Sequence, residues 1–133
     1  MSPDSPSLGS LEALKTSKIV VVDDEPTTLD MLEMFLETEG YENVVTLSDS
    51  TRALDTIFSE RADLVLLDLM MPEVDGLEIL KAMSEDRKLR RIPVVVFSSS
   101  SDRDLKLQAL ELGAAEFLAQ PVDPSELALR VRN

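Results

Sequence analysis

Cysteine, histidine and tryptophan are all missing from this chain of 133 residues. Without cysteine, the chain has no disulfide, no thiol nucleophile and no Cys-based zinc site. Without histidine, it has no Ser-His-Asp triad, no histidine metal cluster and no phosphohistidine of its own. Any chemistry performed here must therefore use carboxylates, hydroxyls, amides, Lys or Arg.

Positive charge is also scarce, because 13 Lys and Arg residues stand against 26 Asp and Glu residues, for a net charge of −13. Such a chain should repel a phosphate backbone, so we expect no nucleic-acid partner for this segment. It has no apolar run close to the ~20 residues of a membrane span, and its start, MSPDSPSLGS, lacks a signal-peptide pattern. We therefore expect a cytoplasmic protein with no membrane partner.

The distribution of apolar residues predicts one α/β domain behind a short tail. Residues 1–17 are rich in Ser and Pro and predict a flexible N-terminal tail, which leaves residues 18–133 for the domain. Short β-branched or Leu-rich runs predict five strands, at Ile19–Val22, Val44–Leu47, Leu64–Leu67, Val94–Phe97 and Ala115–Ala119. Apolar residues between them recur at helical spacing, in the sets Leu29, Leu32 and Leu36; Leu54, Ile57 and Phe58; Leu77, Leu80 and Met83; and Leu105, Ala109 and Leu112. This alternation predicts a parallel sheet with helices on both faces.

The predicted helices have recognisable ends. Gly40 and Gly113 stand where two of them should stop, and Asp123 followed by Pro124 should begin the last one. A basic cluster precedes the fourth strand, and we interpret it as a solvated turn; it consists of Arg87, Lys88, Arg90 and Arg91.

Acidic residues follow two of the predicted strands. Asp23 and Asp24 end the first strand, Asp68 ends the third, and Ser98 ends the fourth. Ligand sites in open parallel sheets form outside the carboxyl ends of the strands, so these side chains converge if the three strands are neighbours. Each residue alone is more typical of a helix N-cap or a turn, which applies also to the run Ser98–Ser101.

Together, the carboxylates point to a cation. Three carboxylates a few ångströms apart repel one another unless a proton or a cation lies between them. A set of oxygen ligands that leaves room for water and phosphate suits Mg²⁺. The sequence therefore predicts a magnesium site at the carboxyl end of the sheet.

These features, in this order, resemble the receiver domain of bacterial two-component response regulators. The resemblance rests on the acidic pair Asp23-Asp24, the segment DLMMPEVDG (residues 68–76), Ser98, and the segment GAAEFLAQP (residues 113–121). It extends from about Ser17 to the end of the chain. It implies a flavodoxin-like (βα)5 doubly wound sheet with strand order 2-1-3-4-5.

The resemblance also implies a reaction and a cofactor. Asp68 would accept a phosphoryl group from a phosphohistidine on a sensor histidine kinase or a phosphotransfer protein. Mg²⁺ would be bound by Asp24 and Asp68 directly, by Asp23 largely through water, and by the backbone carbonyl of Met70. Such a domain catalyses only its own phosphorylation and dephosphorylation, so we expect no enzyme acting on a separate substrate.

Further positions would hold the phosphoryl group and respond to it. By resemblance, Ser98, Ser99 and Gln120 contact the group, and Ser98 with Phe117 forms a switch that reshapes a partner-binding face. Phe117 is equally compatible with a plain core residue. The implied partners are the kinase or phosphotransfer protein, a downstream effector domain or protein, and a second copy in a homodimer. Because the last predicted helix is short and ends on LALRVRN, we expect an excerpt of a longer regulator with an effector domain after it; the alternative is a stand-alone domain with a frayed end.

One residue departs from the family pattern, and it supports an alternative. The family usually has Lys immediately before the proline that follows the fifth strand, whereas this chain has Gln120. A neutral amide makes a weaker hydrogen bond than an ammonium, so the domain could instead be an interaction module that works without phosphorylation. Two other classes fit less well. A haloacid dehalogenase-type hydrolase would need Asp where Glu25 stands and a substrate cap, and a flavin carrier is disfavoured by short acidic loops and the lack of Trp.

Overall fold

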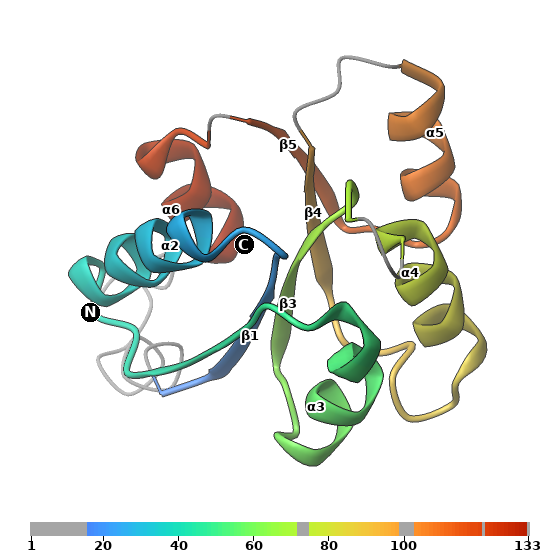
Figure 1. The fold of residues 1–133 in the computed structure, drawn as a ribbon, viewed down its shortest axis with the longest axis horizontal. Helices are drawn as coiled ribbons and strands as arrows, with labels where there is room; N and C mark the ends of the chain where they lie inside the picture. Colours follow the sequence, from blue (N-terminus) through green and yellow to red (C-terminus); the bar gives the residue numbers. More distant parts are fainter. Residues whose placement is uncertain (1–15, 72–74, 99–102, 121, 133) are drawn as a thin grey trace, which may run out of the picture.

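A computed structural model of the chain describes residues 16–71, 75–98, 103–120 and 122–132 (Figure 1). The proposed phosphoryl contact of Ser99 and the turn or cap expected around Ser101 lie outside these residues, as does most of the expected N-terminal tail. No helix in the described ranges has the length and apolar character to cross a membrane.

The sheet has the predicted topology. Five parallel strands lie in the order β2-β1-β3-β4-β5, the flavodoxin-like order. Their bounds are β1 Lys18–Val22, β2 Asn43–Leu47, β3 Leu64–Asp68, β4 Val94–Ser98 and β5 Glu116–Ala119. Each expected strand is present, with bounds that differ by a residue or so. The central strands are continuously apolar because helices cover both of their faces.

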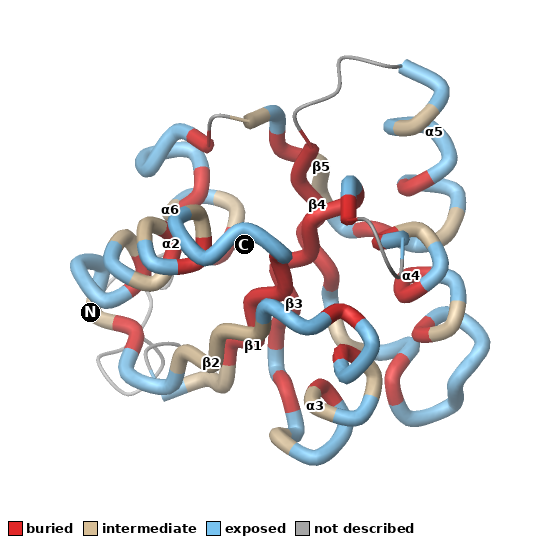
Figure 2. Tube along the Cα trace, viewed as in Figure 1, coloured by how far each residue is buried: buried red, intermediate tan, exposed pale blue. Residues whose placement is uncertain are grey.

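Helices cover the sheet on both sides, as Figure 1 shows. α2 (Pro26–Thr38) and α6 (Pro124–Arg132) lie on one face, and α3 (Ala53–Ser59), α4 (Gly76–Glu85) and α5 (Arg103–Glu111) lie on the other. A short 3-10 helix, η1 (Ser50–Arg52), precedes α3. Alternate residues of each strand enter two separate apolar cores. In β1, Val20 and Val22 pack toward α3 and α4, whereas Ile19 and Val21 pack toward α2 and α6. Figure 2 shows that β1, β3 and β4 are the most buried part of the chain.

Three helices end in the same way. Gly40, Arg61 and Gly113 follow α2, α3 and α5 with φ angles of 96°, 54° and 102°. In each case the next residue donates its N–H to a carbonyl five residues earlier, for example Ala62 to Ile57 at 3.2 Å. This is the Schellman pattern, which favours glycine because a Cβ is strained at positive φ. Both predicted glycine stops are confirmed, and the third is occupied by arginine.

Two helix starts in the second half of the chain are capped by aspartates. The Asp123 carboxylate accepts the N–H of Ser125 at 2.8 Å, which confirms the expected start of α6. The Asp75 carboxylate accepts the N–H of Leu77 at 2.9 Å and begins α4.

One residue of α3 departs from the expected helical face. Phe58, which shares the helical spacing of the buried Ile57, faces outward instead and is 51% exposed. Only one side of the short α3 contacts the sheet, and Ile57 occupies it.

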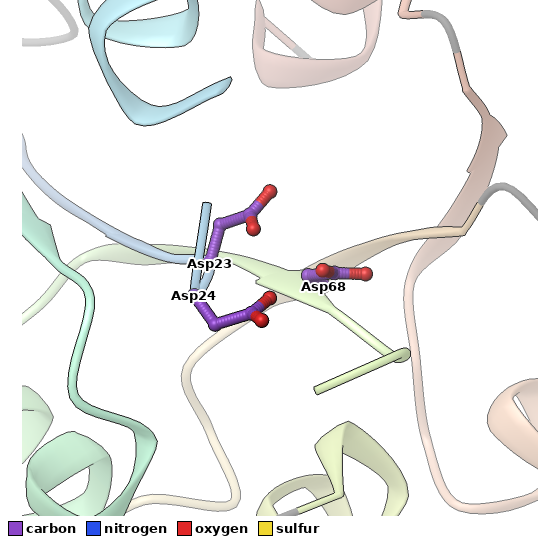
Figure 3. A group of neighbouring side chains, drawn as sticks. All are labelled: Asp23, Asp24 and Asp68. Atoms are coloured by element: carbon purple, nitrogen blue, oxygen red, sulfur yellow. The ribbon is translucent and has the colours of Figure 1, made fainter. Parts of the chain in front are cut away.

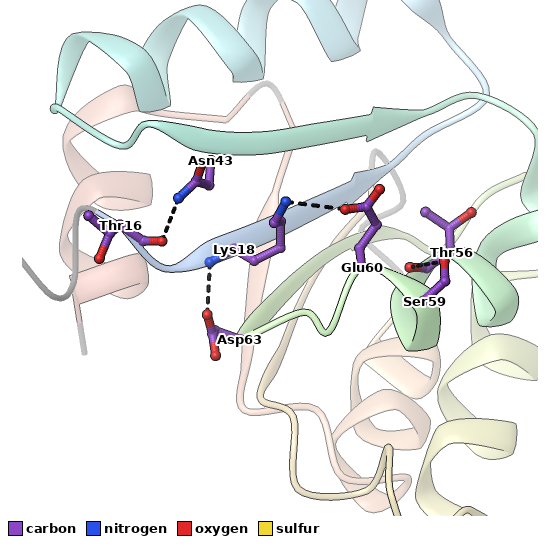
Figure 4. A network of polar contacts seen from close by, with 7 residues as sticks. All are labelled: Thr16, Lys18, Asn43, Thr56, Ser59, Glu60 and Asp63. Carbon is purple, nitrogen blue, oxygen red and sulfur yellow. Dashed lines mark hydrogen bonds and ion pairs between the residues drawn. The ribbon is translucent and has the colours of Figure 1, made fainter.

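The amino-terminal edge of the sheet carries a polar network, drawn in Figure 4. Lys18 donates its backbone N–H to the Asp63 carboxylate at 2.8 Å, and its ammonium contacts Glu60 at 3.2 Å. The Asn43 amide donates to the Thr16 carbonyl at 2.7 Å. Acids at this edge are therefore paired, and they help to tie β1, β2 and β3 together.

Candidate functional site

Three carboxylates meet at the opposite, carboxyl-terminal edge of the sheet. Asp68 is the last residue of β3, and Asp23 and Asp24 directly follow β1. Val22 is the register partner of Leu67. The residues that follow them, Asp23 and Asp68, therefore lie at the same level of the sheet. Figure 3 shows the three side chains at these neighbouring strand ends. One oxygen from each lies within 4.8 Å of the others.

Two of these carboxylates are buried. Asp23 is 1% exposed and Asp68 is 5% exposed, whereas Asp24 faces solvent. Asp23 Oδ1 accepts the N–H of Glu25 at 2.9 Å, and Asp68 Oδ1 accepts the N–H of Met70 at 3.0 Å. Asp23 Oδ2 is buried and has no hydrogen-bond partner among the described residues. A buried polar oxygen without a partner is costly, and either a proton or a bound cation would relieve it.

The electrostatics of the pair agree with this. The pKa of Asp23 is raised to about 7, mainly by burial and further by the nearby Asp68 and Asp24 carboxylates, against the lowering effect of the Glu25 N–H. Burial also raises the pKa of Asp68, with the Asp24 carboxylate adding to the effect and the Met70 N–H opposing it. A positive charge between Asp23 and Asp68 would stabilise the charged form of both carboxylates.

The donor set fits a hard divalent cation. All three side chains offer a carboxylate oxygen, and Asp23 is also the residue whose Oδ2 has no partner among the described residues. Mg²⁺ prefers one or two carboxylates and keeps water or phosphate in its remaining positions. Asp23, Asp24 and Asp68 are therefore the residues that would hold such an ion. The predicted role of the Met70 carbonyl stays a prediction, and the Met70 side chain is 54% exposed beside the site.

The remaining predicted site residues lie on the adjoining strands. Asp68 is in register with Phe97, so Ser98, buried at the end of β4, lies one residue beyond the level of Asp68. Gln120 follows β5 and donates its backbone N–H to the Ser98 carbonyl at 2.9 Å. Phe117 is half-buried in β5, where the Lys106 ammonium lies 5.9 Å from the centre of its ring. Ser98 and Gln120 thus lie near the carboxyl ends of β4 and β5, whereas Phe117 is level with Leu67, one residue before Asp68. The roles of all three stay predictions.

Sequence reasoning missed how closely α4 approaches the site. A Cβ on Gly76 would overlap the carbonyl oxygen of Asp68 and would lie 2.6 Å from the Cα of Leu69. Gly76 also donates its N–H to the Leu69 carbonyl at 3.3 Å. The first turn of α4 therefore rests directly on the backbone of Asp68 and Leu69, and only glycine permits this contact. The Asp75-Gly76 pair was the available signal, since Asp before a helical pattern is typical of an N-cap.

Comparisons with known proteins agree with this arrangement. A family model described as the response regulator receiver domain matches residues 19–132. The alkaline phosphatase synthesis transcriptional regulatory protein PhoP of Bacillus subtilis (strain 168) is 36% identical over 115 residues, which cover 86% of this chain and 47% of that protein. This chain thus spans about half the length of that relative.

Solved structures show the same fold. A putative response regulator from Chloroflexus aurantiacus J-10-fl superposes with a TM-score of 0.83 at 30% identity, over 89% of this chain and 96% of that one. The chemotaxis protein CheY4 of Vibrio cholerae superposes with a TM-score of 0.81 at 26% identity, over 88% and 97% of the two chains. The sequence motifs, the sheet order and the position of the carboxylates agree with these matches, and the chain belongs to the response regulator receiver domain family.

Proposed function

We propose that this domain accepts a phosphoryl group on Asp68 in a Mg²⁺-dependent reaction. The observation that carries the proposal is the group of three carboxylates at the ends of β1 and β3, with one buried Asp23 oxygen that has no partner among the described residues. Asp68 is the member of this group that ends the central strand, and its Oδ1 is held by the Met70 N–H. Its family membership supports a signalling role rather than that of an enzyme with a separate substrate.

The donor would be a phosphohistidine on a sensor histidine kinase or a phosphotransfer protein. A carboxylate oxygen of Asp68 would attack the phosphorus, so that a new P–O bond forms and the P–N bond breaks. The histidine ring, protonated on its other nitrogen, leaves as neutral imidazole with the bonding electron pair. No other reactant is required, and the product is an acyl phosphate. The absence of histidine from this chain fits the role of acceptor, because the donor residue must come from a partner.

Charge compensation is the main requirement of such a transfer. A bound Mg²⁺ would supply positive charge between the carboxylates and the incoming phosphoryl oxygens. The chain's own residues hold the geometry: the Met70 N–H orients Asp68, the Glu25 N–H orients Asp23, and Gly76 keeps the start of α4 against the strand end. Ser98 is placed to contact the phosphoryl group from β4.

The downstream consequence belongs to the same proposal. Ser98 and Phe117 would couple the phosphoryl group to a change in a partner-binding face, and a cytoplasmic effector domain or protein would read that change. The hydrolase and flavin-carrier alternatives gain no support from the family to which the chain belongs. The interaction module without phosphorylation remains the second candidate, because Gln120 offers a neutral amide where an ammonium would compensate charge.

Labelling with acetyl phosphate tests the proposal. Wild type with Mg²⁺ should gain the mass of one phosphoryl group, located on Asp68 by peptide mass spectrometry, and Asp68→Asn should gain none. Asp63→Asn is the matched control, since Asp63 immediately precedes β3 and lies at the other edge of the sheet. Label on Ser98, Asp23 or Asp24 would contradict the assignment of Asp68. A wild type that never labels, while Gln120→Lys does, would favour the interaction module.

A further inference from the structure

The amino-terminal edge of the sheet presents a basic surface on an acidic protein. Five of the 13 basic residues gather there, although the net charge of the chain is −13. All are exposed, and none makes an ion pair with a carboxylate in the described part of the chain; they are Arg61, Arg87, Lys88, Arg90 and Arg91. We refer to these five residues together with Phe58 as the basic edge. Lone exposed cations are ordinary, but a cluster of this size against the overall charge indicates a partner.

Two segments far apart in the sequence build the basic edge. Arg61 follows α3, and the other four cations lie in the loop between α4 and β4; Figure 1 shows both segments at the same end of the sheet. Arg61 and Lys88 line one shared hollow. The Asp86 carboxylate accepts the N–H groups of Lys88 and Leu89 at 2.7 and 3.1 Å. Oδ1 of this exposed acid therefore orders the loop that presents the cations.

The surface between the cations is apolar. One hollow of about 230 Å³ is lined by Ile57, Phe58 and Ala62 as well as Arg61 and Lys88. A second hollow, of about 380 Å³, is lined by Leu80, Met83 and Leu112 as well as Arg90 and Arg91. The two hollows share Leu89 and Ile92. The exposed ring of Phe58 lies 5.2 Å from the Lys88 ammonium. An occupant must therefore combine negative charge with an apolar side chain.

The backbone gives an independent reason to assign a role to Arg61. It occupies the left-handed position that glycine takes after α2 and α5, with the same pattern of hydrogen bonds. A non-glycine residue is uncommon and strained at this position, which makes Arg61 a candidate for a functional role. Because Arg61 stands at this one helix end and within the basic edge, we infer that its charge contributes to binding at that surface.

We propose that the basic edge binds an acidic peptide segment of a partner protein, with one apolar side chain of that segment entering a hollow beside Phe58. A nucleic-acid duplex fits less well, because the rest of the chain repels it and the hollows are apolar. A second copy of this chain would meet the same net repulsion, and a contact between opposite edges would not close on itself. The proposal is independent of phosphorylation, which concerns the other edge of the sheet.

A designed peptide tests the proposal directly. The probe is a short synthetic peptide of glutamates around one central leucine, titrated into the full chain and followed by amide chemical shifts. Shifts should centre on Arg61 and residues 87–92 and weaken with added salt. Arg90→Ser with Arg91→Ser should weaken binding about tenfold, since two exposed charge pairs are lost. Arg52→Ala, an exposed arginine before α3, should leave binding unchanged.

Arg61 separates a functional role from a structural one. Arg61→Gly should raise the midpoint of thermal unfolding, because strain is removed, and should weaken peptide binding several-fold. Arg61→Ala should weaken binding to the same extent without that rise in the midpoint, and Arg61→Lys should keep the affinity. Stabilisation by Arg61→Gly with unchanged affinity would overturn the proposal. So would shifts elsewhere on the chain, equal binding of a peptide with serine in place of leucine, tighter binding of a DNA duplex, or self-association in sedimentation experiments.

Discussion

Asp63 stands just before β3 and Asp68 at its end, and the two acids differ in exposure and in their neighbours. Asp63 precedes β3, faces solvent and accepts the backbone N–H of Lys18 at 2.8 Å. Asp68 ends the same strand, is buried, and lies beside two further carboxylates. The same residue type therefore serves structure at one edge of the sheet and creates an electrostatic conflict at the other. Position in a parallel sheet, rather than residue type, decides which of the two roles an acid takes.

The contrast extends to the whole of both edges. At the amino-terminal edge, helix ends are closed by Schellman turns and the acids Asp63 and Glu60 contact Lys18. At the carboxyl-terminal edge, the oxygen Asp23 Oδ2 is buried without a partner among the described residues. The acids Asp63 and Glu60 of the first edge therefore have partners within the chain, whereas the second edge holds a buried acid oxygen without one among the described residues. Four experiments would break or sharpen this contrast.

The largest expected effect is the response to Mg²⁺. At an ion concentration about 100 times the dissociation constant, the free energy of unfolding of wild type should rise by about 2.7 kcal/mol. Asp24→Ala and Asp68→Ala should abolish this rise in chemical denaturation experiments, because each removes an oxygen ligand. Asp63→Ala should keep it. Equal titrations for all four proteins would remove the distinction between the two edges.

The next largest effect should come from Gly76→Ala, whose added Cβ overlaps neighbouring atoms at the carboxyl-terminal edge. The added Cβ meets main-chain atoms of Asp68 and Leu69, so the free energy of unfolding should fall by about 2 kcal/mol. The apparent affinity for Mg²⁺ should fall as well, since the strand end must move. Urea unfolding with and without Mg²⁺ measures both quantities. A variant with wild-type stability would mean that α4 can shift without disturbing Asp68.

Gln120→Lys should make the carboxyl-terminal edge more like the other one, by supplying a cation. Replacing a neutral hydrogen bond with a charge-assisted one contributes about 1 kcal/mol, so labelling by acetyl phosphate should become several-fold faster. Labelling rates at a fixed donor concentration, compared with wild type, measure the effect. The isosteric Gln120→Glu is the control and should slow the reaction, because it adds like charge. If all three rates agree, Gln120 plays no part in compensating the phosphoryl charge.

Gly113→Ala, at the amino-terminal edge, should have the smallest effect, because it strains the backbone but causes no overlap. Nothing lies within 4 Å of the position that its Cβ would take, but the φ angle is +102°. We expect a loss of about 1 kcal/mol in the free energy of unfolding and no change in Mg²⁺ affinity. Comparison with Gly76→Ala in one denaturation series separates strain from overlap. A change in Mg²⁺ affinity here would show that the two edges are coupled.

The fold and the convergence of the carboxylates could be predicted because they depend on patterns along the sequence. Apolar strands alternate with helical spacing, and strand ends in a parallel sheet share one edge, which placed Asp23, Asp24 and Asp68 together. Close approach and backbone angle leave weaker signals. The overlap at Gly76 depends on how α4 packs against β3, whereas a glycine after an aspartate in a sequence is equally typical of an ordinary turn. The left-handed angle of Arg61 could not be predicted, because arginine is not a turn residue.

The short helix α3 shows the same limit. Ile57 and Phe58 both fit the helical spacing, and the sequence predicts no difference between them. The structure buries Ile57 and exposes Phe58 because a helix of two turns presents only one narrow side to the sheet. The interpretation of the basic cluster as a solvated turn agrees with the exposure of its four side chains, Arg87, Lys88, Arg90 and Arg91. That this turn lies beside Phe58 and Arg61 could be known only from the three-dimensional arrangement.

The contact at Gly76 also limits how this domain can evolve. The atoms that a side chain at this position would meet belong to the main chain of Asp68 and Leu69, and every amino acid carries those atoms. A damaging substitution at position 76 therefore cannot be compensated by exchanging its neighbours for smaller residues, which is the usual route when two side chains collide. Selection for restored function from Gly76→Ala should return glycine itself, or a change in the length of the segment that joins β3 to α4.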